Sequence, residues 1–112
     1  MRIAIPVVNG MLCSHFGHCK DFVLIDVDVD TNAIQSEETV EAPPHQPGLL
    51  PVWLAEKGVR VVIAGGMGNR AQAIFNQQGV ETVVGVAAGS PEDIVEAYLD
   101  GRLETGGNLC DH

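Results

Sequence analysis

Residues 13–19 read Cys-Ser-His-Phe-Gly-His-Cys, which places two cysteines and two histidines in one short segment. Thiolate and imidazole groups bind zinc, iron, copper and iron–sulfur species, and a glycine at position 17 would let the segment fold around an ion. The spacing matches no standard zinc finger, in which the ligands come in closer pairs. A solvated loop with one buried cysteine is the alternative. The candidate metal ligands are Cys13, His15, His18 and Cys19.

A second candidate is the glycine loop, Gly65-Gly66-Met67-Gly68-Asn69. A buried strand is expected before it and a helix after it, so backbone amides and the positive end of the helix would favour an anion. The loop contains neither the Walker sequence nor the GxGxxG fingerprint. Tight packing between strand and helix would also explain the glycines. Met67 is either a soft ligand or a cover over the site.

Two further groups could contribute to such a site. The sequence ends in Cys110-Asp111-His112, which could complete a Cys/His cage with the first segment or form an inert tail. His45 has prolines on both sides, at positions 43, 44 and 47, and is either a rigidly held imidazole or an ordinary surface histidine.

An enzymatic function is the hypothesis that the sequence favours least. A cysteine–histidine hydrolase would use Cys13 or Cys19 as nucleophile and a histidine at position 15, 18 or 45 as base. The sequence offers no third residue at a recognisable spacing to orient that base. Asp26, Asp28 and Asp30 could suggest a divalent metal, but their alternation in a strand and at its end indicates solvent-facing side chains.

Periodicity predicts the order β-β-β-α-β-α-β-α in one α/β domain over residues 1–101, followed by a flexible C-terminal tail over 102–112. Strands joined by helices should be parallel, and the first three strands should be antiparallel neighbours. The result is a three-layer fold, a mixed five-stranded sheet flanked by helices, with the glutamate-rich strand 33–41 at an edge. Strands are expected at 2–8, 22–29, 33–41, 59–64 and 80–87, and helices at 47–57, 69–78 and from Ser90 to Gly101.

This topology brings the candidate residues together. The loops that leave the strands at 9–20, 42–45, 65–69 and 88–90 should all lie at one edge of the sheet, where open α/β sheets bind ligands. The Cys/His segment, His45 and the glycine loop would therefore converge, whereas nothing forces the tail to return there.

Composition narrows the class of partner. The net charge is −9 and the six Lys and Arg residues are scattered, which argues against nucleic acid and anionic membranes. No apolar run approaches the ~20 residues of a membrane span, and we expect no signal peptide. Three cysteines indicate free thiols or ligands more than a disulfide framework, so we expect a cytoplasmic protein.

The MRIAIPV opening, the Ser14-His15-Phe16-Gly17 loop, Phe22 and the strand-Gly65-Gly66-Met67-Gly68-helix segment resemble the dinitrogenase iron–molybdenum cofactor biosynthesis family over nearly the whole chain. That family includes NifX-like carriers, the C-terminal domain of NifB-type proteins and the orange protein of sulfate reducers. The resemblance implies a ribonuclease H-like fold. It also implies a non-catalytic, nitrogenase accessory-like role in holding an iron–sulfur or molybdenum-containing cluster, including molybdenum–iron or molybdenum–copper sulfide, during assembly or transfer.

The resemblance also implies which residues contact the cluster and which proteins interact with this chain. Basic residues such as Arg70 would matter more than the thiols, and attraction must be local because the cluster and the protein are both anionic. Partners would be an assembly or recipient protein, including an ATPase. The alternatives are a mononuclear zinc or iron module held by Cys13, Cys19, Cys110 and a histidine, or a metal-free protein-interaction domain. The full candidate set is Ser14, His15, Phe16, Gly17, His45, Gly65, Gly66, Met67, Gly68, Asn69 and Arg70 for the cluster, and Cys13, His15, His18, Cys19, Cys110 and His112 for a metal.

Overall fold

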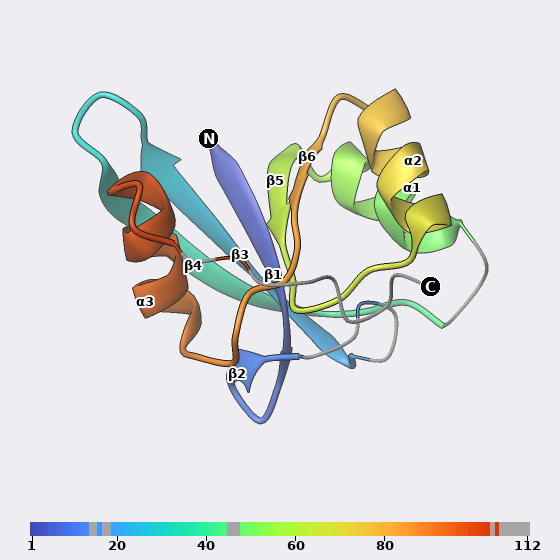
Figure 1. Ribbon diagram of the computed structural model, residues 1–112. Coiled ribbons are helices and arrows are strands. Elements are labelled where there is room, and N and C mark those ends of the chain that lie inside the picture. The colour runs from blue at the N-terminus through green and yellow to red at the C-terminus, as the bar shows by residue number, and fades with distance from the viewer. Residues whose placement is uncertain (14–15, 17–18, 45–47, 104, 106–112) are drawn as a thin grey trace.

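The computed structural model describes residues 1–13, 16, 19–44, 48–103 and 105 of the chain (Figure 1). Its strands form one mixed sheet in the order β4-β3-β1-β5-β6, and the short β2 pairs with the end of β1. In chain order the elements are β1 Arg2–Val8, β2 Met11–Leu12, β3 Asp21–Asp28, β4 Ala33–Glu41, α1 Leu49–Glu56, β5 Val59–Ile63, α2 Asn69–Gln77, β6 Glu81–Val83 and α3 Pro91–Leu99.

The strand directions confirm the predicted mixed topology. β1 is antiparallel to β3, and β3 is antiparallel to the edge strand β4. β5 is parallel to both β1 and β6, because helices connect those strands. The ends of β1, β4, β5 and β6 and the start of β3 therefore lie along one edge, the lower edge in Figure 1, which we call the site edge.

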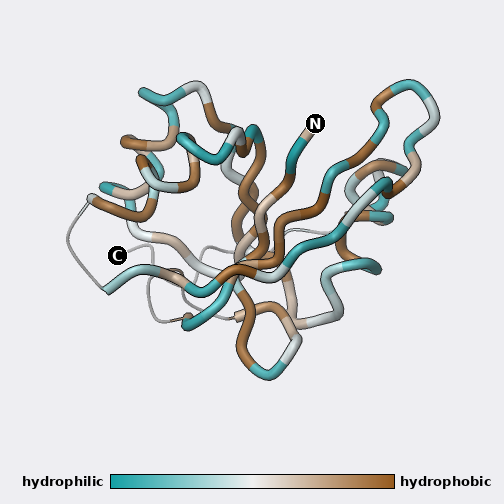
Figure 2. The backbone as a smooth tube through the Cα atoms, turned by 180° about the vertical axis from the view of Figure 1, so that it is seen from behind, coloured by the Kyte–Doolittle hydropathy of each residue, from teal (hydrophilic) through white to brown (hydrophobic). Residues whose placement is uncertain are grey.

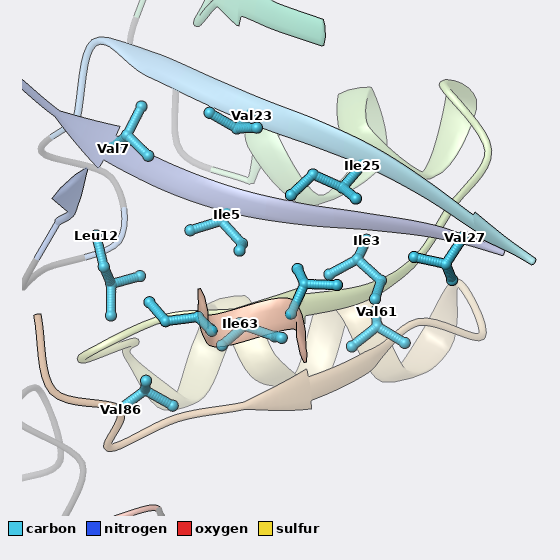
Figure 3. Close-up of a cluster of buried hydrophobic side chains, with 12 residues drawn as sticks. Ile3, Ile5, Val7, Leu12, Val23, Ile25, Val27, Val61, Ile63 and Val86 are labelled. Carbon is cyan, nitrogen blue, oxygen red and sulfur yellow. The ribbon is translucent and has the colours of Figure 1, made fainter. Parts of the chain in front are cut away.

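Helices cover both faces of the sheet, which gives the predicted three layers. α3 packs on one face over an aliphatic cluster to which β1, β3 and β5 contribute alternate side chains, including Ile5, Ile25 and Ile63 (Figure 3). α1 and α2 pack on the other face, where Phe22 and Phe75 are fully buried. β1 is thus buried on both sides from Ile3 to Val7, as its nearly continuous apolar sequence predicts.

The hairpin between β1 and β2 was not predicted. Asn9 and Gly10 both have positive φ, 53° and 79°, which is the backbone of the Asn-Gly turn that favours two-residue hairpins. The hairpin extends past the site edge, and its two arms are hydrophobic at Val8 and Met11 (Figure 2). It adds a sixth strand to the sheet and redirects the chain toward the cysteines.

Several element boundaries differ from the prediction, and three of them have a visible cause or consequence. β3 ends at Asp28, whose side chain accepts a hydrogen bond from the Asp30 amide at 2.9 Å, so Val29 is 60% exposed instead of buried. β6 ends at Val83 because Gly85 has a φ of 81°, outside the β region. α1 begins only after Gly48. No helix of the described residues is long and apolar enough to cross a membrane.

Candidate functional site

Backbone hydrogen bonds join the segment after β1 to two other loops at the site edge. The Phe16 amide donates to the Gly66 carbonyl at 2.8 Å, and the Leu12 amide donates to the Gly89 carbonyl at 3.0 Å. Residues far apart in sequence are thus held side by side, and the predicted convergence of these loops is confirmed for the described residues. His45 lies outside them.

The same segment is also tied to the sheet itself. The Cys13 amide donates to the Pro6 carbonyl at 2.8 Å, just before the first cysteine leaves the hairpin. The Ala42 amide donates to the Lys20 carbonyl at 2.7 Å, just after Cys19. Both ends of the Cys/His segment therefore have fixed backbone positions.

Phe16 anchors the middle of the segment through its ring. The ring is half-buried and makes edge-to-face contacts with Phe22 and Phe75, with centroids 5.8 Å and 5.5 Å apart. Phe22 in turn lies 5.9 Å from Trp53, over which the Lys57 ammonium sits at 4.8 Å. This aromatic row couples the position of Phe16 to the core beneath α1 and α2.

Cys13 and Cys19 form a disulfide, and both residues are almost completely buried, with 7% and 8% of their surface exposed. The expectation of free thiols is therefore wrong for this pair. Two fixed backbone ends, with Cα atoms 6.2 Å apart, place the sulfurs within bonding reach. Because a metal binds the thiolate, ligation by either cysteine stays a prediction that first requires reduction.

The glycine loop is buried against the sheet at its first residues and exposed to solvent at its last. Gly65 and Gly66 are buried, and the Gly85 amide donates to the Gly65 carbonyl at 2.9 Å. Gly68 is the exposed N-cap of α2, and because it has no side chain the first amides of the helix keep no side-chain cap. A Cβ at Gly68 would meet no described atom within 4 Å, so open space lies beside this N-cap residue.

The other members of the glycine loop differ in what they can offer. Met67 is fully buried and belongs to the core of the α1/α2 face, and its role as a soft ligand or a cover stays a prediction. Its carbonyl accepts a hydrogen bond from Gln72 Nε2 at 3.0 Å. Asn69 and Arg70, at the start of α2, are exposed and can face a ligand.

Seven predicted site residues fall outside the described residues, so their roles stay predictions. Within the described part of the chain, no three His, Cys, Asp or Glu side chains are grouped so as to hold a metal ion. The seven are Ser14, His15, Gly17, His18, His45, Cys110 and His112.

Charge is distributed unevenly around the site. Of the fifteen acidic residues, only Glu56 lies within residues 42–80, the part that forms α1, β5 and α2 and that carries Lys57, Arg60 and Arg70. All other acidic side chains come from the first forty-one residues or from Glu81 onward. The amino end of α2 thus belongs to the one part of the chain with a positive balance, which could accept an anion locally.

Three side chains on the α3 side of the sheet, Glu37, Glu92 and Tyr98, have shifted pKa values. A hydrogen bond to Glu92 raises the pKa of Glu37 and lowers that of Glu92, which joins β4 to the first turn of α3. Burial, together with a 2.7 Å hydrogen bond to Glu81, raises the pKa of Tyr98 to about 12. These pairs connect elements of the scaffold and lie in different elements from the glycine loop.

Sequence reasoning missed two contributors to this edge. Lys20 is exposed beside Cys19 and adds a second cation, a position that adjacency in the sequence could have indicated. Gly85 bonds to the glycine loop through its amide, and its left-handed φ of 81° is a conformation that glycine adopts readily.

Comparison with known proteins agrees with this architecture. The family described as dinitrogenase iron-molybdenum cofactor matches residues 1–101. An uncharacterized protein of Methanocaldococcus jannaschii, MJ0580, is 30% identical over 109 residues, which cover 93% of this chain and 90% of that protein. The crystal structure of PH0822 superposes with a TM-score of 0.86 at 32% identity and covers 94% of each chain. The apo form of the orange protein from Desulfovibrio gigas shares the fold, with a TM-score of 0.73, 24% identity and coverage of 96% and 93%. This chain therefore belongs to the dinitrogenase iron-molybdenum cofactor family.

Proposed function

We propose that this chain is a non-catalytic carrier that binds a metal–sulfur cluster at the site edge. The observation that carries the proposal is the 2.8 Å hydrogen bond from the Phe16 amide to the Gly66 carbonyl, which keeps the Cys/His segment beside the glycine loop. Membership of the dinitrogenase iron-molybdenum cofactor family supports the same class of cargo. The cargo would be an iron–sulfur, molybdenum–iron or molybdenum–copper sulfide cluster.

Attraction for such a cluster would be local. Sulfide clusters are anionic, and the first amides of α2, which have no side-chain cap, are donors beside the open space at Gly68. Arg70 and Lys20 are exposed cations, and each follows one member of the Phe16–Gly66 contact by four residues in the chain. Screening over ~8 Å at physiological salt weakens repulsion from the acidic α3 face, so that these near groups dominate.

Side chains of the Cys/His segment would complete the holding surface. Ser14 and His15 would donate hydrogen bonds to sulfide, and Gly17 would let the backbone approach. His18 and His45 are further donors of the same kind, and the tail residues Cys110 and His112 are candidates of lower weight. A cluster-assembly or recipient protein, including an ATPase, would be the partner, and a cytoplasmic location fits this role.

Anaerobic reconstitution tests the proposal. The purified chain in its disulfide form is incubated with iron and sulfide, and separately with tetrathiomolybdate and copper, and is then desalted. Free thiols are counted afterwards, and only protein whose disulfide is still closed after exposure to sulfide is scored. We expect a stoichiometric charge-transfer chromophore that elutes with the protein under one of the two conditions. A protein that stays colourless under both conditions would overturn the proposal.

A pair of variants tests whether the cluster lies in front of α2. Gly68→Val fills the open space, and its extended backbone, with φ −65° and ψ 155°, accommodates a β-branched residue. Ala73→Val adds similar bulk at an exposed position later in the same helix. We expect Gly68→Val to abolish the chromophore at a cost of only ~1 kcal/mol in unfolding free energy, and Ala73→Val to retain it. Equal retention in both variants would place the cargo elsewhere.

A further inference from the structure

The disulfide joins two cysteines whose backbone positions do not depend on it. Cys13 donates its amide to Pro6 in β1, and the carbonyl of Lys20, next to Cys19, accepts from Ala42. These bonds connect main-chain atoms on separate parts of the sheet. Cleavage of the S–S bond would therefore leave the two side chains close together, as a preformed pair of thiols.

We propose that Cys13–Cys19 is a reversible redox site, which a dithiol opens and whose released thiolates bind a thiophilic metal centre. In the opening step, two thiols of the reductant become a disulfide and pass two electrons and two protons to the Cys13 and Cys19 sulfurs. Metal binding then displaces both protons from the cysteines and forms two metal–sulfur bonds. In the return step a disulfide oxidant accepts two electrons from the two thiolates and two protons from solvent and becomes two thiols, while the metal is released and the Cys13–Cys19 bond forms again.

The separation of the two residues suits a shared metal ion. Thiolates bind zinc at ~2.3 Å, so two of them on one tetrahedral ion lie ~3.8 Å apart. Side chains on Cα atoms 6.2 Å apart can reach that separation by rotation about χ1, without movement of the backbone. The remaining coordination positions stay available to water or to sulfide of the cargo.

The position of the pair links this redox site to the carrier function, and this link rests on the proposed function. Phe16 lies between the two cysteines in the chain and contacts the glycine loop through Gly66. In the disulfide form the cargo would be held by amides and imidazoles alone, whereas in the dithiol form two covalent ligands are added. Change in redox state would thus convert weak holding into ligation at one edge of the sheet.

A reducing compartment such as the cytoplasm would favour a reversible bond. Thiol reductants keep most cysteines reduced there, and the disulfides that do form in the cytoplasm of most organisms are transient or redox-sensing. The burial of both cysteines restricts attack by large thiols and so favours a small dithiol as the reductant.

Titration with cadmium measures metal binding by the thiol pair independently of any cluster. Cys110→Ser removes the third thiol, so that all thiolate absorption reports Cys13 and Cys19. Disulfide and dithiothreitol-reduced forms of this variant are desalted anaerobically and titrated with Cd²⁺, while free thiols are counted before and after reduction. The same variant with Cys13→Ser and Cys19→Ser is the matched control.

We expect the reduced form to gain two thiols and to bind a single Cd²⁺ with a thiolate charge-transfer band, and the disulfide form and the control to lack that band. Hydrogen exchange should show the amides of Cys13 and Phe16 protected in both redox states. Absence of the band in the reduced form, or an equal Cd²⁺ affinity in both forms, would overturn the proposal. Because cluster reconstitution is measured on the disulfide form, either proposal can fail while the other stands.

Discussion

The α3 face and the α1/α2 face of the sheet are built from different side chains. The buried cluster under α3 consists of Ile, Val and Leu, whereas all three phenylalanines and the tryptophan lie on the α1/α2 side. Acidic residues concentrate on β4 and α3, and only one lies within residues 42–80. The difference suggests a division of labour, in which the α3 face supports the sheet and the α1/α2 face supports the site.

The aromatic row is what connects the second face to the site edge. Phe16 rests on Phe22 and Phe75, and its own amide bonds to the glycine loop. The α3 cluster reaches the same edge through Leu12, which belongs to its core and whose amide bonds to Gly89. Core changes beneath Phe16 should therefore affect binding more than changes in the part of the α3-side cluster that lies away from Leu12.

The largest expected effect comes from Phe75→Ala. Removal of this fully buried ring should lower the unfolding free energy by ~4 kcal/mol and withdraw the support beneath Phe16. Ile3→Ala, a fully buried counterpart in the α3-side cluster at the opposite edge of the sheet, should cost ~3 kcal/mol and leave the site edge intact. Urea unfolding gives the stabilities, and cluster retention is measured at a temperature where both variants are folded.

Equal cluster retention in the two variants would contradict the proposed difference between the two faces. Loss of retention in Ile3→Ala alone would reverse the assignment of the two faces. Loss in Phe75→Ala alone would support it, because both variants remove core volume and only one of them touches the aromatic row.

Reduction of the disulfide should have the next largest effect on stability. Closure of the short loop between Cys13 and Cys19 restricts the unfolded chain and should contribute ~2 kcal/mol to stability. In the Cys110→Ser variant, a reductant should therefore lower the melting temperature by ~8 °C in the absence of metal. The variant that also carries Cys13→Ser and Cys19→Ser should melt at the lower temperature whether or not reductant is present. An unchanged melting temperature on reduction would contradict the prediction.

Charge at the amino end of α2 should have a smaller effect, on binding alone. Arg70→Glu places an anion beside the proposed cargo, and we expect ~1 kcal/mol of lost affinity, or ~5-fold weaker retention. Arg60→Glu changes the net charge equally but lies near the start of β5, at the opposite edge of the sheet. Dissociation of the cluster into a chelator, measured at two salt concentrations, compares them. An equal loss in both variants would indicate a response to net charge and not to the site.

Much of the fold follows from local signals in the sequence. Ser90-Pro91 predicts a helix start, and Ser90 Oγ does accept the Asp93 amide at 3.3 Å. The continuous apolar run Arg2–Val8 is β1 residue for residue. Each of these signals is contained within one element, so that no distant contact is needed to interpret it.

The site depends more on contacts between distant residues. Topology predicts that the Cys/His segment and the glycine loop share an edge. The hydrogen bond between Phe16 and Gly66, however, depends on the conformations of both loops, which the sequence pattern does not specify. The disulfide could not be inferred because the spacing of Cys13 and Cys19 fits either ligands or a bond, and their separation is set by contacts to Pro6 and Ala42. The Asn9-Gly10 turn, in contrast, had a local signal that was overlooked.

The smallest expected effect lies on the α3 face and concerns pH. The hydrogen bond between Glu37 and Glu92 raises the pKa of Glu37 in the folded protein. A raised pKa contributes stability below the pKa of the unfolded state, and that contribution is lost as pH rises through the folded value. The contact between β4 and α3 should thus be favourable at mildly acidic pH and repulsive at neutral pH.

Glu37→Gln keeps a hydrogen-bond donor at this position and removes the charge. At pH 7 we expect this variant to be more stable than the parent by no more than ~0.5 kcal/mol, because the pair is exposed and screened. The advantage should disappear as pH falls through the Glu37 pKa, since the parent then carries the same donor. Glu96→Gln removes an exposed charge from α3 outside the pair and should show no such pH dependence. Urea midpoints between pH 4 and 7 measure both variants. If cluster retention changed with Glu37→Gln as much as with Arg70→Glu, the separation of a supporting face from a binding face would be wrong.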